Sequence, residues 1–314
     1  MRVVVALGGN ALARRGEPMT ADYLRSNVKS TCEALAGLAR DHELVITHGN
    51  GPQVGLLALQ NLAYQDVAAY PLDILGAETQ GMIGYVVQQE LANALVGERE
   101  VAGIITTTVV SEDDPAFDRP TKLIGPQYSA QDAAEAAAEY RWTIAKDGNA
   151  FRRVVPSPNP IEIVQGPLIR RLLNEGYLCV CVGGGGVPVR TDSKGRHIGV
   201  QAVVDKDLAS AALAEQIQAD TLVMLTDAEY VSQDWGTPQQ RDILTASIDA
   251  ITALPFAEGS MKPKIDAAVR VAKAGGRALI GPLDRLDDLL ARKVGTEIVA
   301  ALPDGIAYVE PPAA

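Results

Sequence analysis

Two predicted helices carry lysines in their first turns, where the positive end of the helix dipole disfavours a cation. Lys206 directly follows Asp205, a suitable N-cap, while Lys262 and Lys264 open a second helix. Each such lysine costs about 0.3–1 kcal/mol unless a bound anion compensates for it. Because both helices begin near the ends of predicted strands, the pattern indicates a polyphosphate held between them. The alternative is that one or more of these side chains, most readily Lys262, extends into solvent.

Glycine-rich turns follow three predicted strands and could offer backbone amides to the same anion. The strands are short apolar runs of the kind that a parallel sheet buries on both faces. Glycine allows a sharp turn and leaves the neighbouring N–H groups open to a ligand. The turn residues are Gly8, Gly9 and Asn10 after the first strand, Gly49, Asn50 and Gly51 after the second, and Gly183–Gly186 after the strand at 178–182. Each turn could instead be a plain connection, and the four glycines a mobile loop.

Helices and strands alternate along most of the chain, which predicts a layered α/β fold. Apolar residues at helical spacing predict helices over 22–40 and 71–95, and β-branched residues predict one strand over 101–110. Ligands of open α/β sheets bind beyond the carboxyl ends of the strands, which is where the glycine turns lie. Further buried strands are expected at 44–47, 178–182, 220–225 and 278–281.

The stretch from 111 to 160 is polar and rich in proline, unlike the sequence around it. Ser129 can cap an Ala- and Glu-rich helix, and a tight Asp147-Gly148 turn can join two strands into a hairpin. A helix and hairpin inserted into an α/β fold are expected to form a lid. Lys122 lies at the base of this insertion between two prolines, where position alone favours a solvated loop lysine.

Composition limits the class of protein. The 314 residues are 47% hydrophobic but only 4% aromatic, so the core must be built from Val, Leu, Ile and Ala. A net charge of −11 argues against nucleic-acid binding, which needs a basic surface. Cys32, Cys179 and Cys181 do not suggest a disulfide framework, and the last two are expected to fill the core of a protein in a reducing cytosol. No run predicts a signal peptide or a membrane span.

Several common catalytic motifs are missing from the sequence. It contains no G-x-x-x-x-G-K-[ST] loop, no protein-kinase motifs, no nucleophile elbow and no zinc signature. His48 is expected to hydrogen-bond within its loop rather than act as a base. Lysines and glycine turns suit phosphoryl transfer, where catalysis is mainly alignment and charge neutralisation.

Longer runs of distinctive sequence lie in collinear order over nearly the whole chain. They are VVALGGNA (4–11), HGNGPQVG (48–55), TQGMIGY (79–85), PTKLIGP (120–126), RVVPSP (153–158), GGGGVP (183–188), VDKD (204–207) and GSMKPK (259–264). Together they resemble the carbamate kinases of the amino acid kinase superfamily. Thr226-Asp227-Ala228-Glu229 is a variant of a looser nucleotide motif of that superfamily.

The resemblance implies a fold, a domain organisation and an activity. The fold would be a three-layer αβα sandwich with an open, mostly parallel central sheet and a small protruding helix/hairpin lid. Residues 1–187 would form an N-terminal lobe for the phosphoryl acceptor, including the lid at about 115–158, and residues 188–314 a lobe for ATP or ADP. The reaction would be reversible phosphoryl transfer between ATP and carbamate, run in arginine fermentation from carbamoyl phosphate and ADP towards ATP.

The resemblance also implies the partners and the setting of the enzyme. It would be a cytoplasmic homodimer with no nucleic-acid or membrane partner. Mg²⁺ would accompany the nucleotide, held through phosphates and water and not by a protein metal site.

The matching motifs imply roles for individual residues. Because carbamate is already an anion at its attacking oxygen, no general base is required. Lys206 and Lys264 would neutralise the β- and γ-phosphate oxygens, Asp207 would orient these lysines, and Lys122 would reach in from the lid. Carbamate and the moving phosphoryl group would be held by the amides of Gly8, Gly9, Asn10, Gly49, Asn50 and Gly51. The nucleotide would be bound by Lys206, Thr226, Asp227, Tyr230, Ser260, Met261 and Lys264.

Three alternatives stay open at the level of sequence. Another acceptor in the same superfamily, such as N-acetylglutamate, aspartate or a nucleoside monophosphate, would need an additional side-chain cation or a larger pocket. A non-catalytic nucleotide-binding regulator would share the fold without turnover. A dinucleotide-dependent oxidoreductase is suggested only by the glycine loops, since the spacing G-x-G-x-x-x-G at 49–55 departs from the dinucleotide fingerprint.

Overall fold

β1 (Arg2–Leu7) lies near the middle of the main sheet in the computed structural model, which describes residues 1–12, 17–257 and 259–310. β1 pairs in parallel with β2 (Glu43–His48) on one side and with β12 (Thr221–Leu225) on the other. Beyond β2 the sheet continues in parallel through β9 (Leu178–Val180) to β3 (Val101–Gly103). The predicted first, second and 220–225 strands are therefore confirmed.

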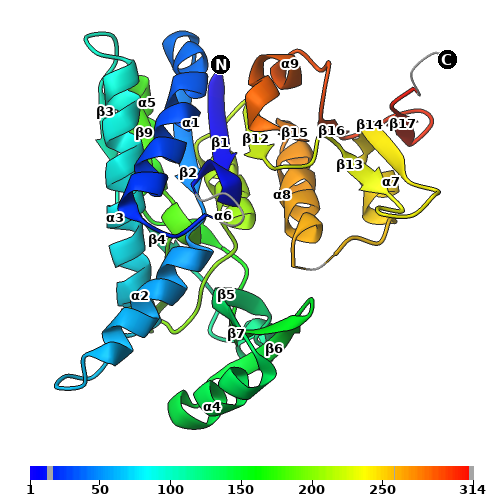
Figure 1. The fold of residues 1–314 in the computed structure, drawn as a ribbon. Helices are drawn as coiled ribbons and strands as arrows, with labels where there is room; N and C mark the ends of the chain where they lie inside the picture. The colour runs from blue at the N-terminus through cyan, green and yellow to red at the C-terminus, as the bar shows by residue number, and fades with distance from the viewer. Residues whose placement is uncertain (13–16, 258, 311–314) are drawn as a thin grey trace.

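The other half of the main sheet is mixed. Beyond β12 its order is β15 (Arg277–Gly281), β16 (Thr296–Val299), β14 (Arg241–Ser247) and β13 (Val231–Gln233), with β17 (Ile306–Tyr308) also paired to β14. β15 pairs in parallel with β12, but β16 is antiparallel to β15, and β13 and β17 are antiparallel to β14. The antiparallel strands enlarge the sheet toward the C-terminal end of the chain (Figure 1).

Helices cover both faces of this sheet. Val3, Val5 and Leu7 of β1 belong to a core with α1, α3 and α9, whereas Val4 and Ala6 belong to a second core with α5, α6 and α8. Alternate side chains of one buried strand thus feed opposite cores, and the three-layer αβα architecture is confirmed. The helices of these two cores are α1 (Ala21–Asp41), α3 (Leu72–Ala94), α5 (Gly166–Asn174), α6 (Lys206–Gln216), α7 (Ile248–Thr252), α8 (Met261–Lys273) and α9 (Leu286–Leu290).

A smaller sheet connects the main sheet to the insertion. Its order is β11 (His197–Gly199), β10 (Val187–Thr191), β4 (Thr107–Val109) and β8 (Glu162–Ile163). The lobe boundary predicted at 187/188 falls at the start of β10, which pairs with β4. The single strand predicted over 101–110 is wrong, because the chain leaves the main sheet after Gly103 and joins this second sheet at Thr107.

The insertion is a separate unit of sheet and helix, at the bottom of Figure 1. β5 (Lys122–Tyr128), β7 (Ala150–Val155) and β6 (Thr143–Asp147) form its sheet, and α4 (Ala130–Tyr140) packs on them. Ser129 caps α4 by accepting a 3.2 Å hydrogen bond from the Asp132 amide. The predicted hairpin is present with its turn shifted by one residue, because Asp147 pairs with Ala150. We call residues 115–158 the lid.

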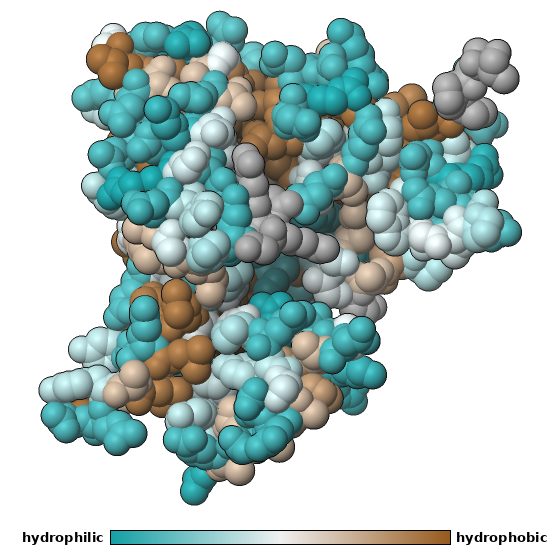
Figure 2. Space-filling view, in the orientation of Figure 1, coloured by the Kyte–Doolittle hydropathy of each residue, from teal (hydrophilic) through white to brown (hydrophobic). Residues whose placement is uncertain are grey.

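The lid contacts the rest of the molecule through a close approach of two glycines. α2 (Gly51–Ala63) packs on β5, and a Cβ built on Gly55 would lie 1.9 Å from Cα of Gly125. Only a residue without a side chain can occupy position 55 in this arrangement. The face shown in Figure 2 is hollowed between the lid and the body above it.

All three cysteines are buried and free, so the predicted core role of Cys179 and Cys181 is confirmed. Burial raises the pKa of the Cys32 and Cys179 thiols to about 12. Among the described helices, none has the length and apolar character needed to cross a membrane.

Candidate active site

Asp207 joins the two predicted lysines at the centre of the site. Lys206 Nζ lies 2.6 Å from Asp207 Oδ1, and Lys264 Nζ lies 2.7 Å from Asp207 Oδ2. The lysines come from the first turns of α6 and α8, which pack against each other. Two cations and one carboxylate leave a net positive charge at a place where both helix dipoles are also positive.

The pKa values of this cluster follow from burial and mutual attraction. Burial alone would raise the pKa of Asp207, but the charges of the two lysines and their hydrogen bonds hold it well below its ordinary value. Burial lowers the pKa of Lys206, whereas for Lys264 burial is outweighed by the charge and hydrogen bond of Asp207 together with the charge of Asp205, so that the pKa is raised. Asp207 therefore stays ionised at neutral pH and holds both ammonium groups in place.

Lys122 and Asp205 link the lid to the same cluster. Asp205 Oδ1 accepts hydrogen bonds from the amides of Asp207 and Leu208, and so caps α6 as predicted. Its Oδ2 accepts from Lys122 Nζ at the start of β5. Lys122 is thus an ion-paired lysine at the cavity, not a solvated one. Lys262 instead pairs with Asp266 one turn along α8.

A cavity of about 390 Å³ brings most of the predicted residues together. Lys122, Lys206, Asp207 and Lys264 line it, together with main chain from the ends of three strands. We call that main-chain side the glycine wall, and it consists of Gly9, Gly49, Asn50, Gly51 and Gly184.

Two of the residues predicted to bind carbamate, Gly8 and Asn10, are not included in the glycine wall. Gly8 lines a different cavity, which it shares with Thr226 and Asp227, and a Cβ on it would come within 2.6 Å of the Leu225 carbonyl oxygen. The backbone of Asn10 lies in the short 3-10 turn Gly9–Ala11, and its side chain is outside the described part of the structure.

His48 supports the glycine wall from behind. Its ring is buried, and its Nδ1 lies 2.9 Å from the Gly49 carbonyl oxygen. Burial lowers the pKa of His48 to about 4, so the neutral ring donates to that carbonyl. The prediction that His48 hydrogen-bonds within its loop is confirmed.

A second cavity of about 650 Å³ adjoins the first, and Ser260 lines both. Of the seven residues predicted to bind the nucleotide, the five other than Lys206 and Lys264 line this cavity. Ser260 makes no side-chain capping bond to α8, and in that first turn the Lys262 amide donates to the Ala257 carbonyl oxygen at 3.1 Å. We call this cavity the aromatic pocket, and it is lined among others by Thr226, Asp227, Tyr230, Trp235, Phe256, Ser260 and Met261.

Sequence reasoning missed several residues of the site. Gln53 and Arg152 line the cavity of the lysine cluster, and Trp235 and Phe256 line the aromatic pocket. Gln53 lies in the HGNGPQVG run and Arg152 directly precedes the RVVPSP run, so motif context could have found them. Trp235 comes from a turn and Phe256 from an irregular segment, where no periodicity marks them. Across residues 1–12, 17–257 and 259–310, no three His, Cys, Asp or Glu side chains are grouped as a metal site.

The sequence comparisons identify the class and then the group within it. The amino acid kinase family model matches residues 1–281, and the chain belongs to this family of phosphotransferases. The chain is 51% identical to a carbamate kinase of Haemophilus influenzae over 98% of this chain and 99% of that protein. It is 48% identical to a carbamate kinase of Rhizobium meliloti over 99% and 97% of the two chains.

A solved structure agrees with these sequence relatives. Carbamate kinase from Giardia lamblia bound to AMP-PNP superposes with a TM-score of 0.85 at 36% identity, covering 95% of this chain and 98% of that one. Within the amino acid kinase family, the chain therefore belongs to the carbamate kinases, as its motifs indicated.

Proposed function

We propose that this enzyme transfers a phosphoryl group reversibly between ATP and carbamate. The observation that carries the proposal is the Lys206–Asp207–Lys264 cluster, which lies between the glycine wall and the aromatic pocket. ADP occupies the aromatic pocket with its phosphates directed at the lysines, and carbamate lies against the glycine wall. Residues 1–187 supply the acceptor side, and residues 188–314 supply most of the nucleotide side.

The chemistry consists of alignment and charge neutralisation. In the direction of ATP synthesis, an oxygen of the ADP β-phosphate attacks the phosphorus of carbamoyl phosphate, the P–O bond to the carbamoyl group breaks, and carbamate leaves as an anion. Two unit charges about 4 Å apart repel by about 1 kcal/mol in water and about 4 kcal/mol at an effective dielectric of 20. Lys206, Lys264 and Lys122 offset this repulsion, and Asp207 keeps two of them in position.

Magnesium enters with the nucleotide as part of the substrate. When bound to the phosphates, the ion withdraws charge from their oxygens. The two carboxylates nearest the site, Asp205 and Asp207, already accept hydrogen bonds from lysines. Ligands for the ion therefore come mainly from phosphate oxygens and water.

We also propose that the enzyme is a cytoplasmic homodimer. Its reaction runs towards ATP in arginine fermentation.

Formation of ATP from carbamoyl phosphate and ADP tests the proposal directly. We expect turnover with these two compounds and none when carbamoyl phosphate is replaced by N-acetylglutamyl phosphate or aspartyl phosphate. Turnover with one of the latter alone would assign a different acceptor. Nucleotide binding without any turnover would assign a regulatory role.

A further inference from the structure

Gln53 carries an amide group that nothing in the described structure satisfies. It lies in the first turn of α2, and only 7% of its surface is exposed. Its Oε1 is buried, and no described residue donates a hydrogen bond to it. A buried polar atom left unpaired costs about 1–3 kcal/mol. Such an atom beside a substrate cavity points to a hydrogen bond that forms only when the ligand is present.

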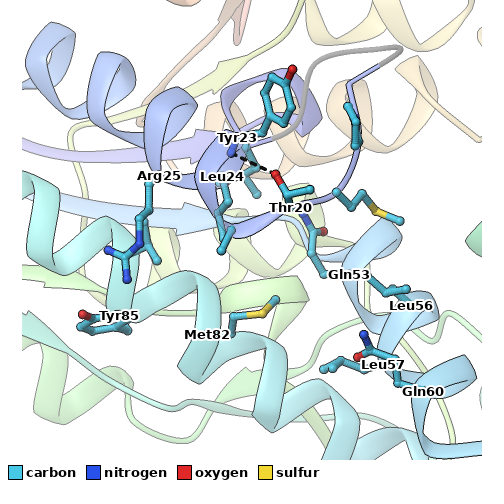
Figure 3. A pocket seen from close by; sticks show the side chains of 15 residues that line it. Thr20, Tyr23, Leu24, Arg25, Gln53, Leu56, Leu57, Gln60, Met82 and Tyr85 are labelled. Carbon is cyan, nitrogen blue, oxygen red and sulfur yellow. Dashed lines mark hydrogen bonds between the residues drawn. The ribbon is translucent and has the colours of Figure 1, made fainter.

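Gln53 lies in the wall between two cavities. It lines the cavity of the lysine cluster and also a second cavity between α1, α2 and α3, where Thr20 and Met82 are neighbours. Figure 3 shows its side chain extending from α2 toward the start of α1, where Thr20 lies. Because Oε1 is enclosed as it stands, a half-turn of the terminal amide, which exchanges its oxygen and nitrogen, is what presents the oxygen to the substrate side.

The carboxylate acceptors around the lysine cluster are already in use. Both oxygens of Asp207 accept from lysines, and both oxygens of Asp205 accept from Lys122 and from backbone amides. The Asn50 amide is anchored by its Nδ2, which donates to Thr79 Oγ1 at 2.8 Å. The Gly49 carbonyl oxygen is directed at His48. Gln53 differs from these residues, because its side-chain oxygen is buried and accepts no hydrogen bond from a described residue.

The amino group is what distinguishes the carbamoyl group from an acetyl group of nearly the same shape. Its nitrogen lone pair is delocalised into the carbonyl, so the group donates hydrogen bonds and needs an acceptor. We propose that the Gln53 side-chain oxygen accepts a hydrogen bond from this amino group and so selects carbamoyl phosphate over acetyl phosphate. This inference rests on the proposed function, since it assigns one contact within that acceptor site.

The test compares Gln53→Met with the wild-type enzyme. Methionine keeps the length of the side chain and removes its hydrogen bonding. We expect the KM for carbamoyl phosphate to rise about 10- to 100-fold, while the inhibition constant of acetyl phosphate against carbamoyl phosphate stays within about threefold. Gln60→Met is the matched control, because Gln60 lies on the same helix and lines the second cavity but not the cavity of the lysine cluster. It should leave both constants unchanged.

If Gln53→Met weakened the binding of carbamoyl phosphate and acetyl phosphate equally, Gln53 would have a structural role and the proposal would be overturned. Unchanged constants for both compounds would also overturn it. If Gln53→Met does not fold, Gln53→Glu decides the matter, because glutamate keeps an acceptor oxygen but adds a negative charge. Both constants should then rise and their ratio should stay near the wild-type ratio, and a ratio shifted in favour of acetyl phosphate would overturn the proposal. Failure of the proposed function is distinct, because the wild-type enzyme itself would then not use carbamoyl phosphate.

Discussion

The glycine wall and the aromatic pocket face the same cleft but are built from different parts of the chain. The glycine wall is main chain, packed so closely that a Cβ on Gly184 would lie 2.2 Å from the Asn50 side chain. The aromatic pocket is lined by side chains from loops, including Trp235, which is 70% exposed. The difference separates two tasks, because the reacting groups need fixed geometry whereas a nucleoside needs only a surface on which to lie. Substitutions on the first side should therefore abolish the reaction, and those on the second should weaken binding.

The largest effect is expected where the lysine cluster meets the glycine wall. Lys264→Met removes one of two cations held by Asp207, and we expect kcat to fall at least about 10³-fold. Lys206 still pairs with Asp207, so the fold should persist. The control is Lys262→Met on the same helix, where the lysine pairs with Asp266. Steady-state rates of ATP formation measure both variants, and similar losses in the two would remove the cluster from the mechanism.

Gly184→Ala tests whether the glycine wall tolerates a single methyl group. Gly184 has φ +61°, and the added Cβ would overlap Asn50. We expect the free energy of unfolding to fall by about 3 kcal/mol or more from strain and overpacking together, with loss of activity. Gly195→Ala is the matched control, because Gly195 has φ +76° but open space around its Cβ position. Gly195→Ala should lower the free energy of unfolding only by the cost of the backbone conformation, about 1 kcal/mol. If urea denaturation gave the same loss for Gly184→Ala and Gly195→Ala, close packing would not be the cause.

The support behind the glycine wall should be sensitive to acid. Burial lowers the pKa of His48 to about 4 in the folded protein, against 6.5 for the free side chain. Between these values the unfolded chain binds a proton that the folded chain does not. The free energy of unfolding should therefore fall as the pH drops from 6.5 to 4, by up to about 3 kcal/mol. Urea denaturation at pH 7 and pH 4.5 measures this fall, and in His48→Asn the contribution of His48 to it should be absent. His197→Asn, at an exposed histidine, should keep the wild-type slope, and parallel curves for all three proteins would refute the assignment.

The smallest effect is expected in the aromatic pocket. Trp235→Ala removes an exposed ring from its lining, and we expect the KM for ADP to rise about three- to tenfold, since stacking on a base contributes about 1–3 kcal/mol even in more buried settings. The value of kcat should stay within about twofold, because the reacting groups lie elsewhere. A fall in kcat larger than the rise in KM would mean that the two sides of the cleft are not separate in function.

Sequence patterns predicted the elements whose signals are local. The apolar run of β1, the Ser129 cap and the Asp205 cap each specify their structure within a few residues, and all three are present. The placement of Lys206 and Lys264 could also be anticipated, because lysines at helix starts are electrostatically unfavourable without an anion. Which carboxylate would hold them followed from family resemblance, not from spacing.

The features that escaped prediction depend on contacts distant in sequence. The run from 101 to 110 has strand composition throughout, and only the pairing of Val187 with Thr107 shows that it is divided between two sheets. The strands β13 and β17 have three residues each, and β14 is partly exposed with a register shift between Ile243 and Thr245, so their periodicity is weak. Gln53 is a polar residue in a helix, and nothing local indicates that its amide is buried without a partner.

The lid leaves and rejoins the smaller sheet at neighbouring points. β4 precedes it, β8 follows it, and the two strands are antiparallel with Thr108 opposite Ile163. The Ile161 amide also donates to the Val109 carbonyl oxygen at 2.9 Å. Some fifty residues therefore replace what could have been an ordinary hairpin connection, and the cost of closing so long a loop grows only slowly with its length. A module attached in this way can be gained, exchanged or trimmed during evolution while the strands that carry it keep their register.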